Sequence, residues 1–194
     1  MNSHVAGIIL AAGGSARLGT PKQLLKLRGK SLINYAVELA LGSHLNPVIV
    51  VLGAEREKIQ TVLAHKEKLK IVANERWREG QSTSLIAGLD ALEVKNTPAI
   101  FLLCDQPNIP ERFISGLIAK YEAEKPDVVM LETYGKKTPP ILFSPNCFSA
   151  IRELQGDKGA RDIIKNFDAR FLHNEDESLV YDVDTLEDFA KLTE

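Results

Sequence analysis

The chain has 194 residues, a formal net charge of −2 and charged side chains at 26% of its positions. A chain of this length is expected to fold as one domain over residues 1–194, burying roughly 70% of its unfolded surface without a disulfide or a structural metal. The small net charge and the lack of a long basic run argue against sequence-independent binding of nucleic acid.

From the first residues to about residue 131, strand-like and helix-like segments alternate. The expected strands are short apolar runs, and the expected helices carry apolar residues at a spacing of three and four. In chain order these are a strand over 5–11, a helix over 32–41, a strand over 48–52, a helix over 55–63, a strand over 70–73, a helix over 82–92, a strand over 98–104, a helix over 110–124 and a strand over 127–131. Such alternation predicts an α/β domain with a mostly parallel sheet and right-handed crossovers.

Beyond residue 132 the alternation loosens. We expect a strand over 141–143, for which an antiparallel direction is open, helices over 146–154 and 159–167, a strand over 169–172 and a closing helix over 185–192. Ligands of open α/β sheets bind beyond the carboxyl ends of the strands. The loops that follow Ala12, Ala73 and Cys104 are therefore the candidate site.

The first residues and the two cysteines bear on the cellular compartment in which the protein is expected. Residues 1–7 lack the basic segment and long apolar stretch of a secretion signal, and the apolar run over 5–12 is too short to span a membrane. Cys104 and Cys147 have no metal-ligand spacing and are expected to be free thiols in a reducing compartment. We therefore expect a cytoplasmic protein with no membrane partner.

The loop after the first strand combines two glycines with fixed positive charge. Gly13 and Gly14 let backbone N–H groups approach a polyanion, and Arg17 and Lys22 can neutralise phosphate oxygens. The loop is neither a P-loop, which needs Gly-Lys-Ser/Thr, nor a Gly-x-Gly-x-x-Gly dinucleotide fingerprint. From composition alone, a flexible connection with surface charges is the other interpretation.

Two acidic segments are candidates for holding a cation. Asp105 directly follows a buried strand, and Asp182 and Asp184 point the same way if their segment is extended. Mg²⁺ is commonly bound by one or two carboxylates together with substrate phosphates and water. Asp105 could equally form the turn before Gln-Pro, and Asp184 or Thr185 could cap the last helix.

The loop over residues 74–85 ends in three hydroxyl side chains before a helix. Residues 82–84 offer an N-cap, and a helix N-terminus there could also face an anion. For Trp77, packing against the core and stacking on a base are both open. The segment over 156–161 is either a helix-initiating turn or a basic site for an anion.

Together, and in this order, these segments resemble the molybdenum cofactor cytidylyltransferases of the MobA-like NTP transferase superfamily. The signature Leu-Ala-Ala-Gly-x-Ser-x-Arg-Met-Gly-x-x-Lys is matched except that Leu18 replaces Met, a mild swap. The family's Trp-x-x-Gly-x-Ser-x-Ser-Leu, Cys-Asp-Gln-Pro and Gly-Asp-x-Gly-Ala-Arg segments are also present, and the similarity runs over about 6–192. The matching segments are residues 10–22, 77–85, 104–107, 139–143 and 156–161.

The resemblance implies a single-domain, Rossmann-like three-layer sandwich of the nucleotide-diphospho-sugar transferase type. It implies an enzyme that transfers CMP from CTP to the phosphate of molybdenum cofactor (molybdopterin), with Mg²⁺ or Mn²⁺ as the metal. Guanylyltransferases of the same group carry Leu-Ala-Gly-Gly in the signature, so Ala12 favours a pyrimidine nucleotide. By analogy, a xanthine-dehydrogenase-like molybdoenzyme would receive the product.

Site roles follow from the same resemblance. The expected catalytic residues are Lys22, Arg17 and Asp105. The expected nucleotide-binding residues are Leu10, Ala11, Ala12, Gly13, Gly14, Ser15, Lys22, Asn74, Gly80, Ser84 and Asp105. The expected acceptor-binding residues are Pro140, Lys158 and Arg161, and the expected metal ligands are Asp105 and Asp184, with Asp182 in reserve. Leu186 stands where the family usually has Pro, which makes the start of the last helix less certain.

Two other functions are compatible with parts of the pattern. A sugar- or polyol-phosphate nucleotidylyltransferase would share the signature loop but would not predict the segments over 104–107 and 156–161 together. A non-catalytic carrier of molybdenum cofactor would be expected to lose Lys22, Asp105 or Asp184, and all three are present.

Overall fold

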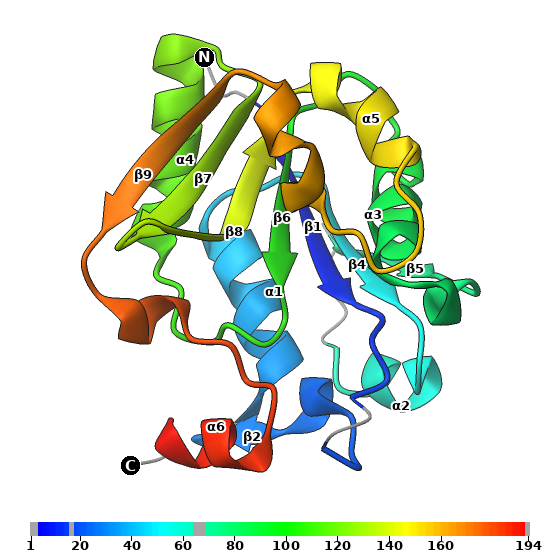
Figure 1. Cartoon of the computed structure of the whole chain (residues 1–194). Helices are drawn as coiled ribbons and strands as arrows, with labels where there is room; N and C mark the ends of the chain where they lie inside the picture. Colours follow the sequence, from blue (N-terminus) through cyan, green and yellow to red (C-terminus); the bar gives the residue numbers. More distant parts are fainter. Residues whose placement is uncertain (1–3, 16–17, 64–68, 193–194) are drawn as a thin grey trace.

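A computed structural model describes residues 4–15, 18–63 and 69–192. The main strands are β1 (Ala6–Ala11), β4 (Val48–Leu52), β5 (Leu69–Ala73), β6 (Ala99–Leu103), β7 (Val128–Thr133), β8 (Lys136–Phe143) and β9 (Ala169–Asn174). They form one seven-stranded sheet in the order β5-β4-β1-β6-β8-β7-β9 (Figure 1). A small ribbon pairs β2 (Lys26–Leu27) with β3 (Lys30–Ser31).

Helices cover both faces of this sheet and give three layers. Apolar residues of α1 (Leu32–Gly42), α2 (Arg56–Gln60) and α4 (Glu111–Glu124) pack in one core on one face. Those of α3 (Gln81–Asp90) and α5 (Phe148–Arg152) pack in a second core on the other. The last helix, α6 (Leu186–Lys191), joins a third cluster with the β2–β3 ribbon (Figure 1). Short 3-10 turns span Lys22–Leu24, Trp77–Glu79, Pro145–Cys147, Ala160–Asn166 and Glu177–Val180.

The centre of the sheet contains the topological switch point. β4 is buried along its whole length, as expected of a parallel strand covered on both faces. From β1 the chain continues to β4 and β5 on one side, and it returns to place β6 on the other side of β1. The carboxyl ends of β1 and β6 therefore flank the crevice where ligands of such sheets bind.

The predicted α/β alternation and the mostly parallel sheet are confirmed. β8 runs antiparallel to both β6 and β7, and it is longer than the expected strand over 141–143. The segment expected as a helix over 159–167 is a 3-10 helix instead. In the part of the chain that the structure describes, no helix is long and apolar enough to cross a membrane.

The start of α3 differs from the prediction. The N-cap is Gly80, with φ 112°, and none of the hydroxyls of residues 82–84 takes that position. α3 begins one residue earlier than expected, because Gly80 supplies the turn, so the three hydroxyls lie inside the first helical turns. The Thr83 hydroxyl donates to the Gly80 carbonyl at 2.8 Å instead of capping the helix.

Candidate functional site

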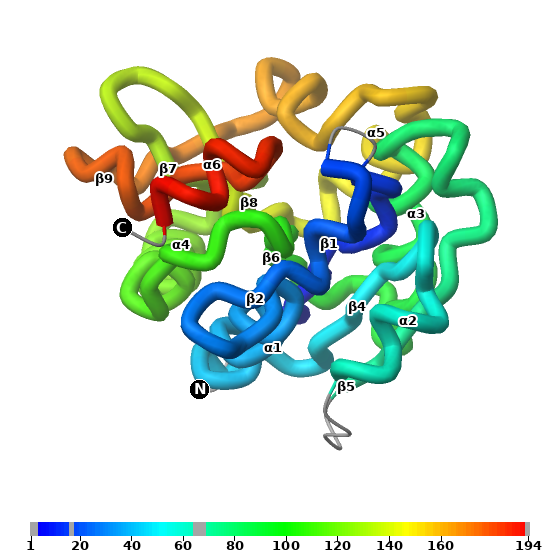
Figure 2. Tube along the Cα trace, turned by 90° about the horizontal axis from the view of Figure 1, so that it is seen from below, coloured from blue at the N-terminus to red at the C-terminus, as the bar shows by residue number. Residues whose placement is uncertain are grey.

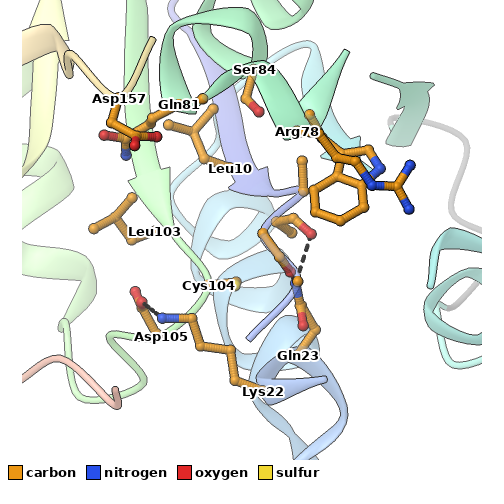
Figure 3. Close-up of a pocket in the computed structure, with 16 residues that line it drawn as sticks. Leu10, Lys22, Gln23, Arg78, Gln81, Ser84, Leu103, Cys104, Asp105 and Asp157 are labelled. Carbon is orange, nitrogen blue, oxygen red and sulfur yellow. Dashed lines mark hydrogen bonds and ion pairs between the residues drawn. The ribbon is translucent and has the colours of Figure 1, made fainter. Parts of the chain in front are cut away.

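A cleft of about 710 Å³ opens at the carboxyl ends of β1 and β6 (Figure 3). One wall is the loop after β1, and the opposite wall is the end of β6 with Asp105. The start of α3 and Asp157 close the remaining side. The cleft therefore lies at the switch point that the sheet topology indicates.

Most of the predicted nucleotide-binding residues line this cleft. Those that do are Leu10, Ala11, Ala12, Gly13, Gly14, Lys22, Gly80, Ser84 and Asp105. Ser15 and Asn74 lie behind the lining: the Ser15 hydroxyl accepts from the Lys22 N–H at 2.9 Å, and Asn74 is buried. The Asn74 amide donates to the hydroxyl of Ser84 at 3.0 Å, so its contact with the cleft is indirect. Arg17 lies outside the described residues.

Lys22 joins the two predicted metal ligands. Its ammonium pairs with Asp105 and lies 3.1 Å from Asp184 Oδ1. The main chain supports the pairing, because the Val183 N–H donates to the Asp105 carbonyl at 3.0 Å. Burial alone would lower the pKa of Lys22, but the charge and hydrogen bond of Asp105, with a smaller part from Asp184, raise it above its usual value. The ammonium is thus charged throughout the neutral range.

The carboxylates suit a divalent cation that is shared with a substrate. Oδ1 of Asp105 is buried and has no hydrogen-bond partner among the described residues, so this acceptor is left for a cation or a ligand. The described residues contain no group of three or more acidic, His or Cys side chains placed to hold a metal. Asp105 and Asp184 would therefore leave coordination positions to phosphate oxygens and water, as Mg²⁺ sites commonly do.

Asp182 has a different partner. Its Oδ1 accepts from the buried Gln106 amide at 2.8 Å. Burial, and then the negative charge of Asp105, raise the pKa of Asp182 above its usual value. Asp184 therefore differs from Asp182, the alternative metal ligand, because Asp184 contacts Lys22 whereas Asp182 contacts Gln106.

The two glycines of the loop differ in their surroundings. A Cβ on Gly13 would meet no atom within 4 Å, whereas one on Gly14 would lie 3.2 Å from the Trp77 ring. Trp77 packs on the second core and also lines the cleft, and the Arg78 guanidinium stacks 4.5 Å from its ring centre. Nothing within the described protein requires glycine at position 13, which suits the close approach of a ligand.

A second pocket of about 300 Å³ adjoins the first. The two share Leu10, Gln81, Leu103 and Asp157 in their linings. The lining of the second pocket combines apolar side chains, Phe101 among them, with charged ones, and it contains Arg161, one of the predicted acceptor-binding residues. Pro139 takes part in the lining, whereas Pro140 and Lys158 do not.

The wall between the pockets is held by close backbone contact. A Cβ on Gly80 would lie 2.2 Å from the carbonyl carbon of Gly156, and the Ser82 N–H donates to the Gly156 carbonyl at 3.1 Å. The loop before α3 and the segment over 156–161 therefore pack as one wall. The sequence motifs predict that both segments belong to the site, but they do not predict that the two are in contact.

Several lining residues were not predicted. They are Gln23, Arg78, Gln81, Leu103, Cys104 and Asp157. All lie beside or within matched motifs, so motif membership was the only signal that could have found them. Cys104 is an inert thiol, because burial, and then the charge of Asp105, raise its pKa to about 12.

An open α/β sheet with a glycine loop, a lysine and two carboxylates at its switch point is suited to binding a nucleotide. The chain belongs to the family of the MobA-like NTP transferase domain, whose model matches residues 7–174. The expected family and fold are thereby confirmed, and the chain is a nucleotidyltransferase of this family.

The chain is similar to relatives that have different names. The chain is 29% identical to the purine catabolism protein PucB of Bacillus subtilis, over 96% of the chain and 94% of the relative. It is 30% identical to the nicotine blue oxidoreductase of Paenarthrobacter nicotinovorans, over 97% and 96%. A probable molybdenum cofactor guanylyltransferase of Natranaerobius thermophilus is 26% identical, over 79% and 73%.

Solved structures share the whole fold. Rv0371c of Mycobacterium tuberculosis superimposes with a TM-score of 0.87 at 26% identity, covering 100% of this chain and 99% of that one. A structure of Rv0371c in complex with manganese has a TM-score of 0.83 at 24% identity and covers 98% of both chains.

Proposed function

We propose that this chain transfers CMP from CTP to the phosphate of molybdenum cofactor, forming the cytosine dinucleotide cofactor and pyrophosphate. One observation carries the proposal: Lys22, Asp105 and Asp184 meet beside a cleft that continues into a second pocket. Two adjoining pockets with a charged cluster beside one of them suit a reaction that joins two substrates.

In this proposal the larger cleft holds the nucleotide. The glycine loop offers N–H groups to the phosphates, and Lys22 stabilises the charge of the triphosphate and of the departing pyrophosphate. The acceptor phosphate is already an anionic nucleophile, so positioning and electrostatics carry the reaction without a strong general base. No histidine lies among the lining residues of either pocket in the described chain, in keeping with this chemistry.

Asp105 and Asp184 would hold the divalent metal, Mg²⁺ or Mn²⁺. When bound, the metal would supply positive charge at the reacting phosphate. The unpaired oxygen of Asp105 and the manganese complex of Rv0371c support divalent-metal use. With the two carboxylates binding the metal, the positive charge of Lys22 would be available to the phosphates.

The second pocket would hold the acceptor. Its apolar side chains, such as Phe101 and Leu103, suit a flat heteroaromatic ring such as a pterin, and Arg161 suits an anionic group. The relative named as a probable molybdenum cofactor guanylyltransferase supports the acceptor class. A xanthine-dehydrogenase-like molybdoenzyme remains our proposed recipient, and a cytoplasmic location our proposed compartment.

Pyrophosphate release tests this proposal. Purified protein with Mg²⁺ would be given each of the four NTPs, with and without molybdenum cofactor, and release with CTP only in the presence of cofactor is expected. If cofactor-dependent release occurred with GTP and with no other NTP, the proposed acceptor would stand and the proposed choice of cytosine as the base would be overturned. Release only with sugar or polyol phosphates would change the acceptor, and tight cofactor binding without any release would identify a carrier.

A further inference from the structure

Gln23 is a buried amide that the scheme above does not use. It lies in the turn Lys22–Leu24, lines the cleft and is only 1% exposed. Its Nε2 donates to two carbonyls of the glycine loop, that of Ala11 at 2.8 Å and that of Gly13 at 2.9 Å (Figure 3). One side chain thus fixes the orientation of two carbonyl groups, those of Ala11 and Gly13, within a three-residue segment of the loop.

These two bonds determine where the next N–H groups point. In a trans peptide the carbonyl and the following N–H point in opposite directions. Because the carbonyls of Ala11 and Gly13 both face Gln23, the N–H groups of Ala12 and Gly14 both point away from it. The intervening carbonyl, that of Ala12, is held separately by the Ala54 N–H at 3.0 Å. Two N–H groups of residues that line the cleft are therefore turned away from Gln23, and successive N–H groups of this kind can bind an anion.

The orientation of the amide is determined by its partners. A reversed Gln23 would place Oε1 against two carbonyl oxygens, so the NH₂ group must face the loop. Oε1 is then buried without a hydrogen-bond partner among the described residues, an arrangement that lowers the stability of the fold. A buried unpaired acceptor calls for a reason beyond stability.

We propose that Gln23 is a positioning residue for the nucleotide: its amide orients the N–H groups of Ala12 and Gly14 toward the triphosphate. Gln23 acts through the loop and touches no phosphate. The inference rests on the proposed function for the nucleotide, but it is independent of which acceptor the enzyme uses.

Binding measured without any acceptor tests this role. Isothermal titration calorimetry would compare CTP, inorganic triphosphate and cytidine on the natural chain, Gln23→Met and Gln23→Glu. Methionine keeps the approximate size and loses both donated bonds, so affinity for CTP and triphosphate should fall about tenfold or more while cytidine binding changes little. Glutamate should weaken triphosphate binding further, because its carboxylate would repel both the carbonyls and the phosphates.

A matched control removes a similar bond elsewhere. The Asn34 amide donates to the Val62 carbonyl at 2.9 Å, and neither residue lines the cleft. Asn34→Leu should cost stability without changing affinity for triphosphate. If Gln23→Met bound triphosphate as the natural chain does, or lost cytidine and triphosphate equally, the positioning role would be overturned.

Two further outcomes separate this role from the proposed function. If neither Gln23 variant folds, NMR on the natural chain tests the inference instead. The amide signals of Ala12 and Gly14 should shift when inorganic triphosphate is added. The absence of a shift would overturn the inference. A natural chain that binds no NTP would overturn both proposals. A natural chain that binds CTP but releases no pyrophosphate with molybdenum cofactor would overturn the acceptor alone.

Discussion

At the scale of single residues, the role of each motif residue in the cleft depends on the side chains that contact it. Lys22 was expected as a cation for phosphate, and the structure adds that both carboxylates of the site contact it. The charge that would stabilise a departing pyrophosphate is therefore already oriented.

Lys22→Ala should lower turnover about 10²–10³-fold, the usual scale for one preorganised electrostatic donor. Steady-state pyrophosphate release would measure this, with Lys26→Ala as the control because Lys26 is a nearby exposed lysine. Turnover near that of the natural chain would remove Lys22 from the mechanism.

Gly13 and Gly29 should respond to alanine in opposite ways. Gly13→Ala should fold normally, since its Cβ would meet open space, and should weaken CTP binding, since that space is where a phosphate would approach. Gly29, at φ 82°, should lose about 1 kcal/mol of stability with alanine and keep its affinity for CTP. Urea unfolding and calorimetry separate the two effects, and unchanged CTP binding by Gly13→Ala would argue against phosphate contact there.

At the scale of elements, the start of α6 positions a site residue. Thr185 and Asp188 form a capping box, and Asp188 also accepts from the Asp184 N–H at 3.2 Å and from the Tyr181 hydroxyl at 2.6 Å. These hydrogen bonds, the one from Tyr181 first, lower the pKa of Asp188 to about 2. The cap therefore orders the main chain of Asp184 as well as the helix.

Asp188→Ala should destabilise the chain at neutral pH, and the difference should shrink in acid. Because the folded pKa of Asp188 is depressed, its contribution is present above the usual value of 3.8 and disappears as the pH falls toward about 2. Urea unfolding between pH 2 and 6 would measure this, with Glu187→Ala, an exposed acid of the same turn, as the control. A difference that does not depend on pH would show that the Asp188 charge contributes nothing.

At the scale of the whole molecule, the site gathers residues from distant parts of the chain. Lys22, Asp105 and Asp184 come from the first loop, the end of β6 and the segment before α6. Seen from below, the C-terminal segment crosses beneath the sheet to reach β6 (Figure 2).

Removal of divalent metal should abolish turnover and leave the fold intact. The two apolar cores on the faces of the sheet stabilise the fold, and neither Asp105 nor Asp184 is part of them. Chelation followed by return of Mg²⁺ or Mn²⁺, with circular dichroism as the check on folding, measures this. Full turnover after exhaustive chelation would rule out a metal requirement.

Most of the sheet was predictable because its strands are locally apolar and its helices locally amphipathic. The antiparallel direction of β8 was left open, since strand direction depends on tertiary pairing that periodicity does not encode. Within the site, the motif residues were predictable by type, whereas the use of Gln23 to orient the glycine loop depends on contacts formed only in the folded chain. Ser31 illustrates the same limit: a serine directly before an amphipathic segment predicts an N-cap, and Ser31 occupies the N-cap of α1, yet its hydroxyl makes no capping bond.

The position of Asp184 outside the sheet affects how the site is assembled. Every strand of the seven-stranded sheet precedes Asp184 in the chain. Asp184 follows ten residues after β9 ends at Asn174, and only its arrival completes the charged cluster with Lys22 and Asp105. The sheet can therefore form without the complete site, which is assembled only when the segment after β9 docks against the residue that follows β6.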